Sequence, residues 1–219
     1  MLHPTIIQAL KKKLTIINWS TILVLYGLFS LWHGAFEGPL TPEEIEVFVN
    51  KYQALNPEKD TKRIRALMEN DDGQPKYMVN AIKLYDSPQL INGKKVGESS
   101  AEILETYTNH VFSFLLRHGS YPIYSGNAVF DAVERWGAEN VDEWTSGAIV
   151  RYRSMRVMMK MSTDPSFRQF HDYKIAAMEK TIAFPTTAVL NLANLSLTIA
   201  FLLIILALIV QLIINQKMA

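Results

Sequence analysis

Two long stretches without a charged residue, one near each end of the chain, constrain its folding more than any other feature. The first is residues 14–32 (LTIINWSTILVLYGLFSLW), and the second, residues 190–214, is longer and more apolar. A helix rises ~1.5 Å per residue, so a stretch of this length nearly crosses the ~30 Å hydrocarbon core of a bilayer. Because an unpaired backbone amide in lipid is costly, each stretch must be helical there. The sequence therefore predicts two transmembrane helices.

Each stretch also has an alternative interpretation. Residues 190–214 would form a buried core helix in a soluble protein, but a chain of 219 residues does not need so long an apolar core helix. Residues 14–32 have the basic start and apolar centre of a cleaved signal peptide. However, the next residues, around Trp32 and Phe36, are too bulky for a small-x-small cleavage site. We therefore interpret the first stretch as a retained anchor.

The charges that flank the first stretch predict its orientation. Three consecutive lysines, residues 11–13, precede it, whereas acidic residues follow it from Glu37 onward. Because lysine-rich flanks stay on the cytoplasmic side, we expect both termini in the cytoplasm and the central domain outside it. In a bacterium this means an inner-membrane protein with a periplasmic domain. Residues 1–13 then form a cytoplasmic or interfacial segment, and residues 215–219 form a cytoplasmic tail.

Nearly all the charge lies between the two stretches. All 21 Asp and Glu residues lie from Glu37 to Glu179, together with 18 of the 22 Lys and Arg residues. This balance gives no basic patch, so nucleic acid is not an expected partner. The chain has no cysteine, which excludes disulfides, thiolate nucleophiles and zinc–thiolate sites. We expect three kinds of partner: the lipid bilayer, further copies of the chain, and other subunits of a membrane complex. Copies of the chain are expected to be joined in part by hydrogen bonds from Asn191, Asn194 and Gln211.

Helix signals dominate residues 33–76. The sequence TPEE at residues 41–44 supplies an N-cap threonine, a proline at the first helical position and a glutamate at the third. This pattern predicts a helix to about Leu55, and a second helix is expected over residues 57–68. We interpret residues 33–76 as a helical connector between the membrane and the domain.

Residues 77–187 alternate between strand and helix patterns. The sequence predicts strands at 77–85, 121–135, 144–153 and 181–187, and helices at 99–117, 154–161 and 165–180. The main elements follow the order β-α-β-β-α-β, which is the ferredoxin-like arrangement. The expected fold class is therefore α+β, with a ferredoxin-like domain at residues 77–187 between two transmembrane helices.

Short motifs across this domain resemble those of a known family. They are Val79-Asn80, Gly97-Glu98-Ser99, Arg117-His118-Gly119, Glu143-Trp144, the run from Val150 to Ser154, and the run from Met161 to Phe167. On these residues, the stretch from 77 to about 184 resembles an uncharacterised family of the dimeric α/β-barrel superfamily, to which antibiotic-biosynthesis monooxygenases belong. The resemblance implies a homodimer whose two sheets face each other. The wider superfamily includes cofactor-free monooxygenases and haem-degrading enzymes, but a shared fold does not transfer chemistry.

The helix at 165–180 carries the leading candidate site. On a helical wheel, His171 and Lys174 fall within the face that Phe167 and Phe170 define. Unpaired charge on a buried face is costly, so this pattern favours a pocket for an anionic or carbonyl-bearing ligand. The alternative is a structural histidine beside a lysine that snorkels at a dimer seam.

The resemblance adds haem as a further alternative. The haem-degrading members have a His four residues after a Phe in this helix and an Asn in the first strand. Phe167, His171 and Asn80 match these positions. The Trp that these enzymes have six residues before the Phe is Met161 here, which argues against haem degradation.

Asn80, Tyr107, His110 and Arg151 are secondary ligand-binding candidates. Asn80 alternates with apolar residues on its strand and is expected to face the interior, where it orients a ligand or bonds a neighbouring strand. Tyr107 and His110 lie one turn apart near an apolar stripe, which is also typical of core residues. Arg151 would bind an anion, or else lie in solvent or in an interface.

The sequence favours a membrane-anchored accessory or structural oligomer. The alternative is an anchored small-molecule-binding protein or a cofactor-independent monooxygenase-like enzyme, so catalysis is left open. The further alternative is a haem-binding protein through His171. No metal site is predicted, and no cofactor is predicted apart from haem in that last case. Motifs for a catalytic triad or a phosphate-binding loop are missing from the sequence.

Overall fold

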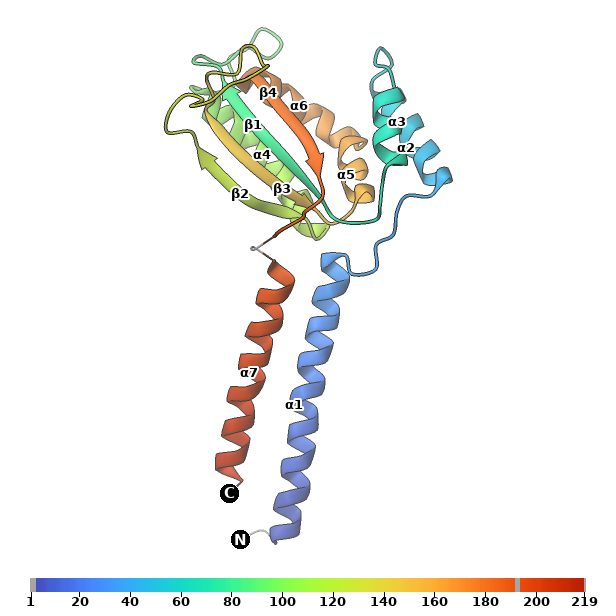
Figure 1. Cartoon of the computed structure of the whole chain (residues 1–219), viewed down its shortest axis with the longest axis vertical. Helices are drawn as coiled ribbons and strands as arrows, with labels where there is room; N and C mark the ends of the chain where they lie inside the picture. Colours follow the sequence, from blue (N-terminus) through green and yellow to red (C-terminus); the bar gives the residue numbers. More distant parts are fainter. Residues whose placement is uncertain (1–2, 192–193, 219) are drawn as a thin grey trace. The chain divides into compact units, whose positions relative to one another are not determined.

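The structure, a computed structural model, describes residues 3–191 and 194–218. It divides into two compact units, each described by itself below (Figure 1). One unit combines Met1–Phe36 with Leu190–Ala219, and the other is Glu37–Val189. The first unit therefore joins the two ends of the chain, and the second is the domain between them.

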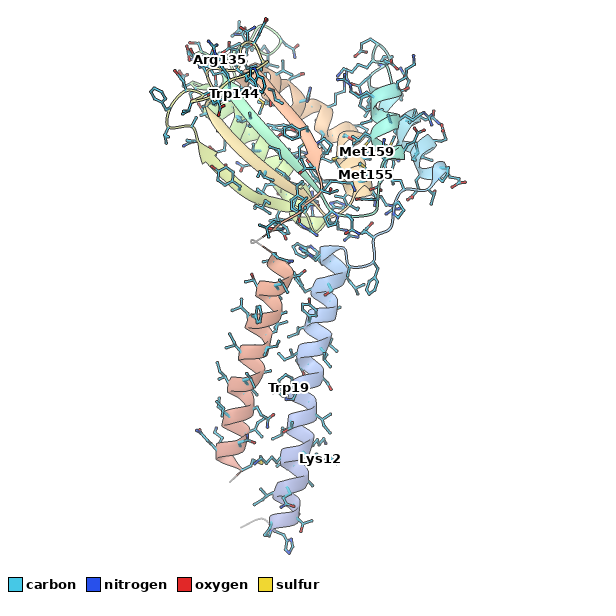
Figure 2. All side chains as sticks on the ribbon, in the orientation of Figure 1. Lys12, Trp19, Arg135, Trp144, Met155 and Met159 are labelled. Atoms are coloured by element: carbon cyan, nitrogen blue, oxygen red, sulfur yellow. The ribbon has the colours of Figure 1, made fainter. Side chains whose placement is uncertain are left out.

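The first unit is a pair of helices, α1 (Pro4–His33) and α7 (Leu195–Lys217). Both are long and apolar enough to cross a membrane. The segment expected to be interfacial continues into the first apolar stretch as one helix, which carries Lys12 and Trp19 (Figure 2).

Polar side chains join α1 and α7 within the chain. Asn18 Nδ2 donates a 3.0 Å hydrogen bond to the carbonyl oxygen of Ala207, and Gln211 Nε2 donates a 2.9 Å bond to Thr15 Oγ1. Gln211 therefore lies on the face of α7 that packs against α1, and its hydrogen bond to Thr15 is made within one chain. The expected bond between Gln211 and another subunit stays a prediction.

The domain is built on a four-stranded antiparallel sheet. Its strands are β1 (Lys76–Leu84), β2 (Tyr121–Asn127), β3 (Ser146–Tyr152) and β4 (Met178–Thr186), in the spatial order β2-β3-β1-β4. Helices α4 (Ser100–Arg117) and α6 (Pro165–Ala177) lie behind the sheet in Figure 1, and the face toward the viewer carries no helix. The predicted α+β class, with two apolar helices near the termini, is confirmed.

Local capping explains where the domain helices begin. Ser99 Oγ accepts from the backbone of Glu102, Ser154 Oγ accepts from Val157, and Asp164 caps α6. These starts agree with the predictions, because each cap satisfies a backbone N–H that the first helical turn leaves unpaired.

Several element ends differ from the prediction; the second connector helix, expected from residue 57, begins at Lys62. Helix α6 stops at Ala177, and β4 begins at once with Met178, because Met178 pairs with Leu84 in the sheet. The second strand stops at Asn127, and residues 128–145 form no helix or strand. Only scattered backbone bonds tie this loop, such as Ala128 N to the carbonyl oxygen of Thr145 at 2.9 Å. Hydrogen bonding between neighbouring strands therefore sets the start of β4 and the end of β2. The local sequence pattern does not reveal this pairing.

The helices expected to form a connector pack into the core of the domain. They are α2 (Pro42–Leu55), which lies against α5 (Met155–Ser162), and α3 (Lys62–Glu69), which lies against α2. One apolar cluster contains residues from all three helices and from α4, namely Ile45, Phe48, Val49, Met68, Phe114, Met155 and Met159. Met155 and Met159 project from α5 (Figure 2) and are each 1% exposed. Flexible methionine side chains thus fill the irregular space between the expected connector helices and the helices that follow them in the domain.

Candidate functional site

A cleft of about 690 Å³ lies between the sheet and the α2–α3 pair. Met78 on β1 and Ala183 and Pro185 on β4 form one wall. Apolar side chains of α2 and α3, including Ile64 and Leu67, form the other. A volume of this size is within the ~300–1,000 Å³ of ordinary ligand pockets. The cleft is therefore large enough for a small organic ligand.

The rim of this cleft is basic. Lys59 and Arg63 line it together with Asp60, whose carboxylate accepts a 2.8 Å bond from the backbone N–H of Lys62. Within the part of the chain that the structure describes, neither Lys59 nor Arg63 makes a side-chain hydrogen bond or ion pair. The rim therefore combines free positive charge with apolar walls.

His171 lies near this rim, on the outer side of α6. It is exposed, so its expected place on the inner face of the helix is corrected. The buried stripe runs through Phe167 and Ala177, and His171 lies at its edge. Partial burial lowers the pKa of His171, and the charges of Lys174 and Lys59 lower it further. These surroundings therefore favour the neutral imidazole over the charged one.

Lys174 and Tyr107 form a contact across α4 and α6. The Lys174 Nζ lies 5.9 Å from the centroid of the Tyr107 ring, a cation–π geometry. Burial lowers the pKa of Lys174 and raises the pKa of the Tyr107 phenol. No carboxylate pairs with Lys174 among the residues described. An ammonium in this position is suited to contact a carbonyl or carboxylate group.

Asn80 lies on the sheet face that forms the cleft wall. It is paired in register with Ala183, one of the wall residues. Its Nδ2 donates to the carbonyl oxygen of Met78 at 2.9 Å, with a longer contact to that of Ala148 at 3.4 Å. The amide nitrogen therefore bonds the backbone of its own strand, and its longer contact reaches the neighbouring strand β3.

Of the remaining two candidates, His110 lies beside the Lys174–Tyr107 contact and Arg151 lies apart from it. The His110 ring stacks on Phe170 at 4.0 Å and meets Phe167 edge-on at 4.7 Å, and its buried Nε2 has no partner in the described structure. Arg151 is on the opposite face of the sheet, where Nη1 donates a 3.0 Å bond to the carbonyl oxygen of Gly119. It is 3% exposed and lies 5.4 Å from the Tyr121 ring. The six predicted residues therefore do not form one site.

The helix-free face of the sheet exposes large apolar side chains. Residues that share a register row point to the same face. One row on this face runs Tyr124, Ile149, Val79, Phe184, and the next runs Gly126, Gly147, Ala81, Ile182. Tyr124 is 56% exposed, Phe184 49% and Ile182 46%. We call this surface the open face.

The loop at residues 128–145 adds to the exposed apolar surface. Val129, Phe130, Val133 and Trp136 are between 77% and 99% exposed. The end of the loop is tied to the sheet by the ion pair of Glu143 with Lys83 at 2.9 Å. Side chains of this size in contact with water are characteristic of interaction sites.

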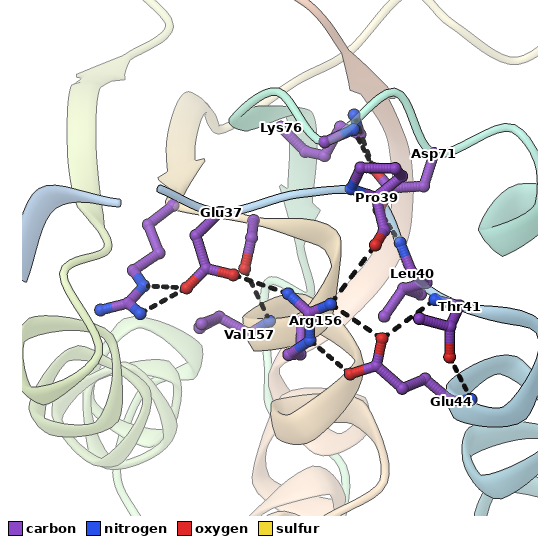
Figure 3. A network of polar contacts seen from close by, with 12 residues as sticks. Glu37, Pro39, Leu40, Thr41, Glu44, Asp71, Lys76, Arg156 and Val157 are labelled. Atoms are coloured by element: carbon purple, nitrogen blue, oxygen red, sulfur yellow. Dashed lines mark hydrogen bonds and ion pairs between the residues drawn. The ribbon is translucent and has the colours of Figure 1, made fainter. Parts of the chain in front are cut away.

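A network of ion pairs fixes the start of the domain (Figure 3). Arg156 on α5 donates to Glu37 at 2.7 Å and to both oxygens of Glu44, at 2.6 and 2.8 Å. Arg153 also donates to Glu37, through Nε at 2.9 Å. The hydrogen bonds from Arg156 hold the pKa of Glu44 at about 2. Sequence reasoning missed this clamp, because its partners lie more than a hundred residues apart.

Comparisons with known proteins find structures of similar fold, but they give no activity. No family model matches the chain, and no curated protein matches it. A crystal structure of methylated RPA0582 protein matches at 21% identity and TM-score 0.51, covering 60% of this chain and 94% of that one. A structure of RPA0582, a protein of unknown function from Rhodopseudomonas palustris, matches at 20% identity and TM-score 0.49, covering 61% and 97%.

Proposed function

We propose that the protein is a membrane-anchored oligomeric accessory protein whose domain pairs with a second copy through its open face. In this proposal α1 and α7 cross the bilayer, both termini are cytoplasmic, and the domain is extracytoplasmic. In a bacterium the domain would be periplasmic.

The strand order supports a ferredoxin-like domain of the dimeric α/β-barrel type. The order β2-β3-β1-β4, with every neighbour antiparallel, is the order that a β-α-β-β-α-β chain adopts in that fold. The short motifs between Val79 and Phe167 favour the same superfamily. In such a barrel the open faces of two sheets would pack against each other.

The exposure of the open face carries the proposal. A sheet needs both of its faces covered when both are apolar. Here α4 and α6 cover one face, whereas Phe184, Ile182 and Tyr124 on the other remain about half exposed. The loop side chains Phe130 and Trp136 extend the apolar surface beyond the end of β2. A second copy supplies a matching apolar surface, which favours a symmetric pair.

The membrane part rests on the composition of the helices. Both helices are long and apolar, and few of their residues are buried, so their apolar side chains point mostly outward. Outward apolar side chains are expected in lipid and unfavourable in water. The lysines at residues 11–13 favour the cytoplasmic placement of the N-terminus.

The pairing is tested with full-length chain in lipid nanodiscs large enough to hold a dimer. Phe184→Glu places a charge on the open face and should convert dimer to monomer, as measured by mass photometry. Phe112→Glu is the matched control, because Phe112 is 45% exposed on a helix surface, away from the sheet. If Phe184→Glu leaves the dimer intact, or if both variants dissociate it equally, pairing through the open face is wrong.

The orientation is tested separately with single cysteines, which the natural chain lacks. Glu139→Cys in the domain should react with a membrane-impermeant maleimide added outside intact cells. Lys217→Cys should react only after the membrane is permeabilised. The reverse labelling pattern would contradict the orientation.

Ligand binding is the second candidate function, and the neutral state of His171 beside a free basic rim favours it. A neutral imidazole is the form that binds haem iron, and Lys174 over Tyr107 suits a carbonyl-bearing substrate of a monooxygenase-like reaction. The visible spectrum of protein purified after expression with haem separates these cases. A Soret band that is lost in His171→Ala would support haem binding. If protein expressed with haem shows no Soret band, haem is excluded and only a ligand without visible absorption is left as a candidate.

A further inference from the structure

We propose that a second cleft, between α2, α4 and α5, binds a phosphate monoester that carries an apolar group. The phosphate would lie among Lys51, Arg117 and Lys160, and the apolar group would lie against Phe48 and neighbouring side chains. This site is separate from the open face, so it does not depend on pairing of the domain.

The cleft has room for more than an inorganic ion. Its volume is about 650 Å³, within the range of organic-ligand pockets. Its apolar lining comes from three elements and consists of Phe48, Ala54, Leu55, Phe114 and Pro165. Phe48 and Phe114 are 6% and 7% exposed, so the bottom of the cleft belongs to the rigid core of the domain. An apolar group on the ligand would therefore meet a preformed surface.

Basic side chains predominate among the charged residues of this cleft. Lys51, Arg117 and Lys160 line it, and His118 lies beside them with its ring stacked on Phe114 at 4.1 Å. Within the described residues, Lys51 and Lys160 make no side-chain hydrogen bond or ion pair. Arg117 Nε donates to the carbonyl oxygen of Ser113 at 3.1 Å, which leaves its terminal nitrogens for a ligand.

Nearby acids offset only part of this charge. Asp164 lines the cleft and caps α6 through a 2.8 Å bond that its Oδ1 accepts from the backbone of Ser166, but its single negative charge leaves the three cations in excess. Glu44 is near enough to Lys160 for their charges to interact, but both of its oxygens are held by Arg156. Elsewhere in the domain, Arg65, Lys76, Lys83, Arg135, Arg153 and Arg156 all have acidic partners. Lys59, Arg63 and Lys174 also lack an acidic partner among the described residues, but this cleft brings three such cations, Lys51, Arg117 and Lys160, to one site.

This charge fits a phosphate monoester better than a singly charged anion. A phosphate monoester carries about −1.5 to −2 charges at pH 7, with three strong acceptor oxygens. Arginine binds phosphate through two parallel N–H groups, and lysine binds it as a point charge. The apolar floor explains why the ester should carry an apolar group. Such an ester could come from a single-chain lipid of the bilayer or from a soluble aryl or alkyl phosphate.

The experiment uses the full-length chain in phosphatidylcholine nanodiscs, with empty nanodiscs as the reference. In one arm 1-naphthyl phosphate is titrated in solution and binding is followed by its fluorescence anisotropy. In the other arm lysophosphatidate is incorporated in the disc and its displacement of the bound 1-naphthyl phosphate is measured. We expect saturable binding, with 1-naphthol and 1-naphthyl sulfate at least tenfold weaker as competitors.

Three variants locate the site. Lys51→Gln combined with Lys160→Gln removes two charges and should weaken binding about tenfold or more, since charged hydrogen bonds of this kind contribute about that much each. Lys62→Gln combined with Lys94→Gln removes the same charge from exposed lysines outside the cleft and should change affinity less than twofold. Ala54→Trp, on the exposed side of α2, fills the cleft without changing its charge and should also weaken binding tenfold.

The outcomes are distinct. Displacement by lysophosphatidate supports a lipid source, and binding of 1-naphthyl phosphate without such displacement supports a soluble source. The proposal is overturned if binding does not exceed that of empty nanodiscs, if the control pair weakens it as much as the cleft pair, or if 1-naphthol competes equally well. Thermal unfolding of each variant checks that the domain remains folded, and Phe184→Glu should leave binding unchanged.

Discussion

The two faces of the sheet come from the same strands and have opposite environments. On the covered face, Met78 and Val150 pack against a cluster that contains Phe114 and Met159. On the open face, Phe184 and Ile182 are alternate residues of one strand and are about half exposed. Successive side chains of a strand point to opposite faces, and apolar residues at both sets of positions make both faces apolar here. Only one of the two faces is covered by helices of the same chain. The covered face therefore stabilises the fold, whereas the open face remains for association.

The sharpest test of this difference is Phe114→Ala. Phe114 is 7% exposed and meets the Phe167 ring edge-on at 5.1 Å, so truncation leaves a cavity in the core. We expect a loss of about 3–5 kcal/mol in the free energy of unfolding, measured by urea denaturation with tryptophan fluorescence. A loss below about 1 kcal/mol would mean that the covered face is not tightly packed.

Arg156→Ala tests the clamp that holds α2 against α5 on the covered side. The substitution leaves Glu37, whose side chain is 12% exposed, with fewer partners. We expect a loss of about 2 kcal/mol in unfolding free energy. Arg135→Ala is the control, because it breaks a single ion pair, with Asp142, whose side chains are 58% and 49% exposed. Equal losses in the two variants would contradict a special role for the clamp.

The same clamp predicts acid sensitivity. The pKa of Glu44 is about 2 in the fold, against an ordinary value of 4.5. Because the folded pKa is lower, this contribution is complete above about pH 4.5 and is lost as the pH falls toward 2. We expect it to be about 1 kcal/mol, since solvent screening reduces the value of a partly exposed pair. Urea unfolding at pH 6 and pH 3 should show a smaller pH-dependent loss for Glu44→Gln than for the natural chain.

The smallest effect is expected on the open face. Phe184→Ala should change the unfolding free energy of the monomer by about 0.5 kcal/mol or less, because exposed substitutions create no cavity. The measurement is made at dilution, where mass photometry shows monomer only. A loss comparable with that of Phe114→Ala would show that the open face is buried within a single chain, and would remove the basis for pairing.

Local signals predicted the framework well. The caps at Thr41, Ser99 and Ser154 fix helix starts, because each depends on side chains within three residues of the helix. The candidate site was predicted less well. His171 is on the outer side of α6, and Arg151 lies across the sheet from Asn80. Helical spacing predicts which side chains share one face of a helix, but it does not predict which other element packs against that face.

The sequence by itself determined the elements whose causes are local: two apolar stretches able to cross a membrane, the capped helices and the alternating strands. Only the tertiary structure decided which distant residues meet. It paired Glu37 with Arg156, placed α2 and α3 in the domain core, and left one face of the sheet bare. The physical reason is that backbone hydrogen bonding and periodicity act over a few residues, whereas packing and ion pairing depend on how the chain folds back on itself.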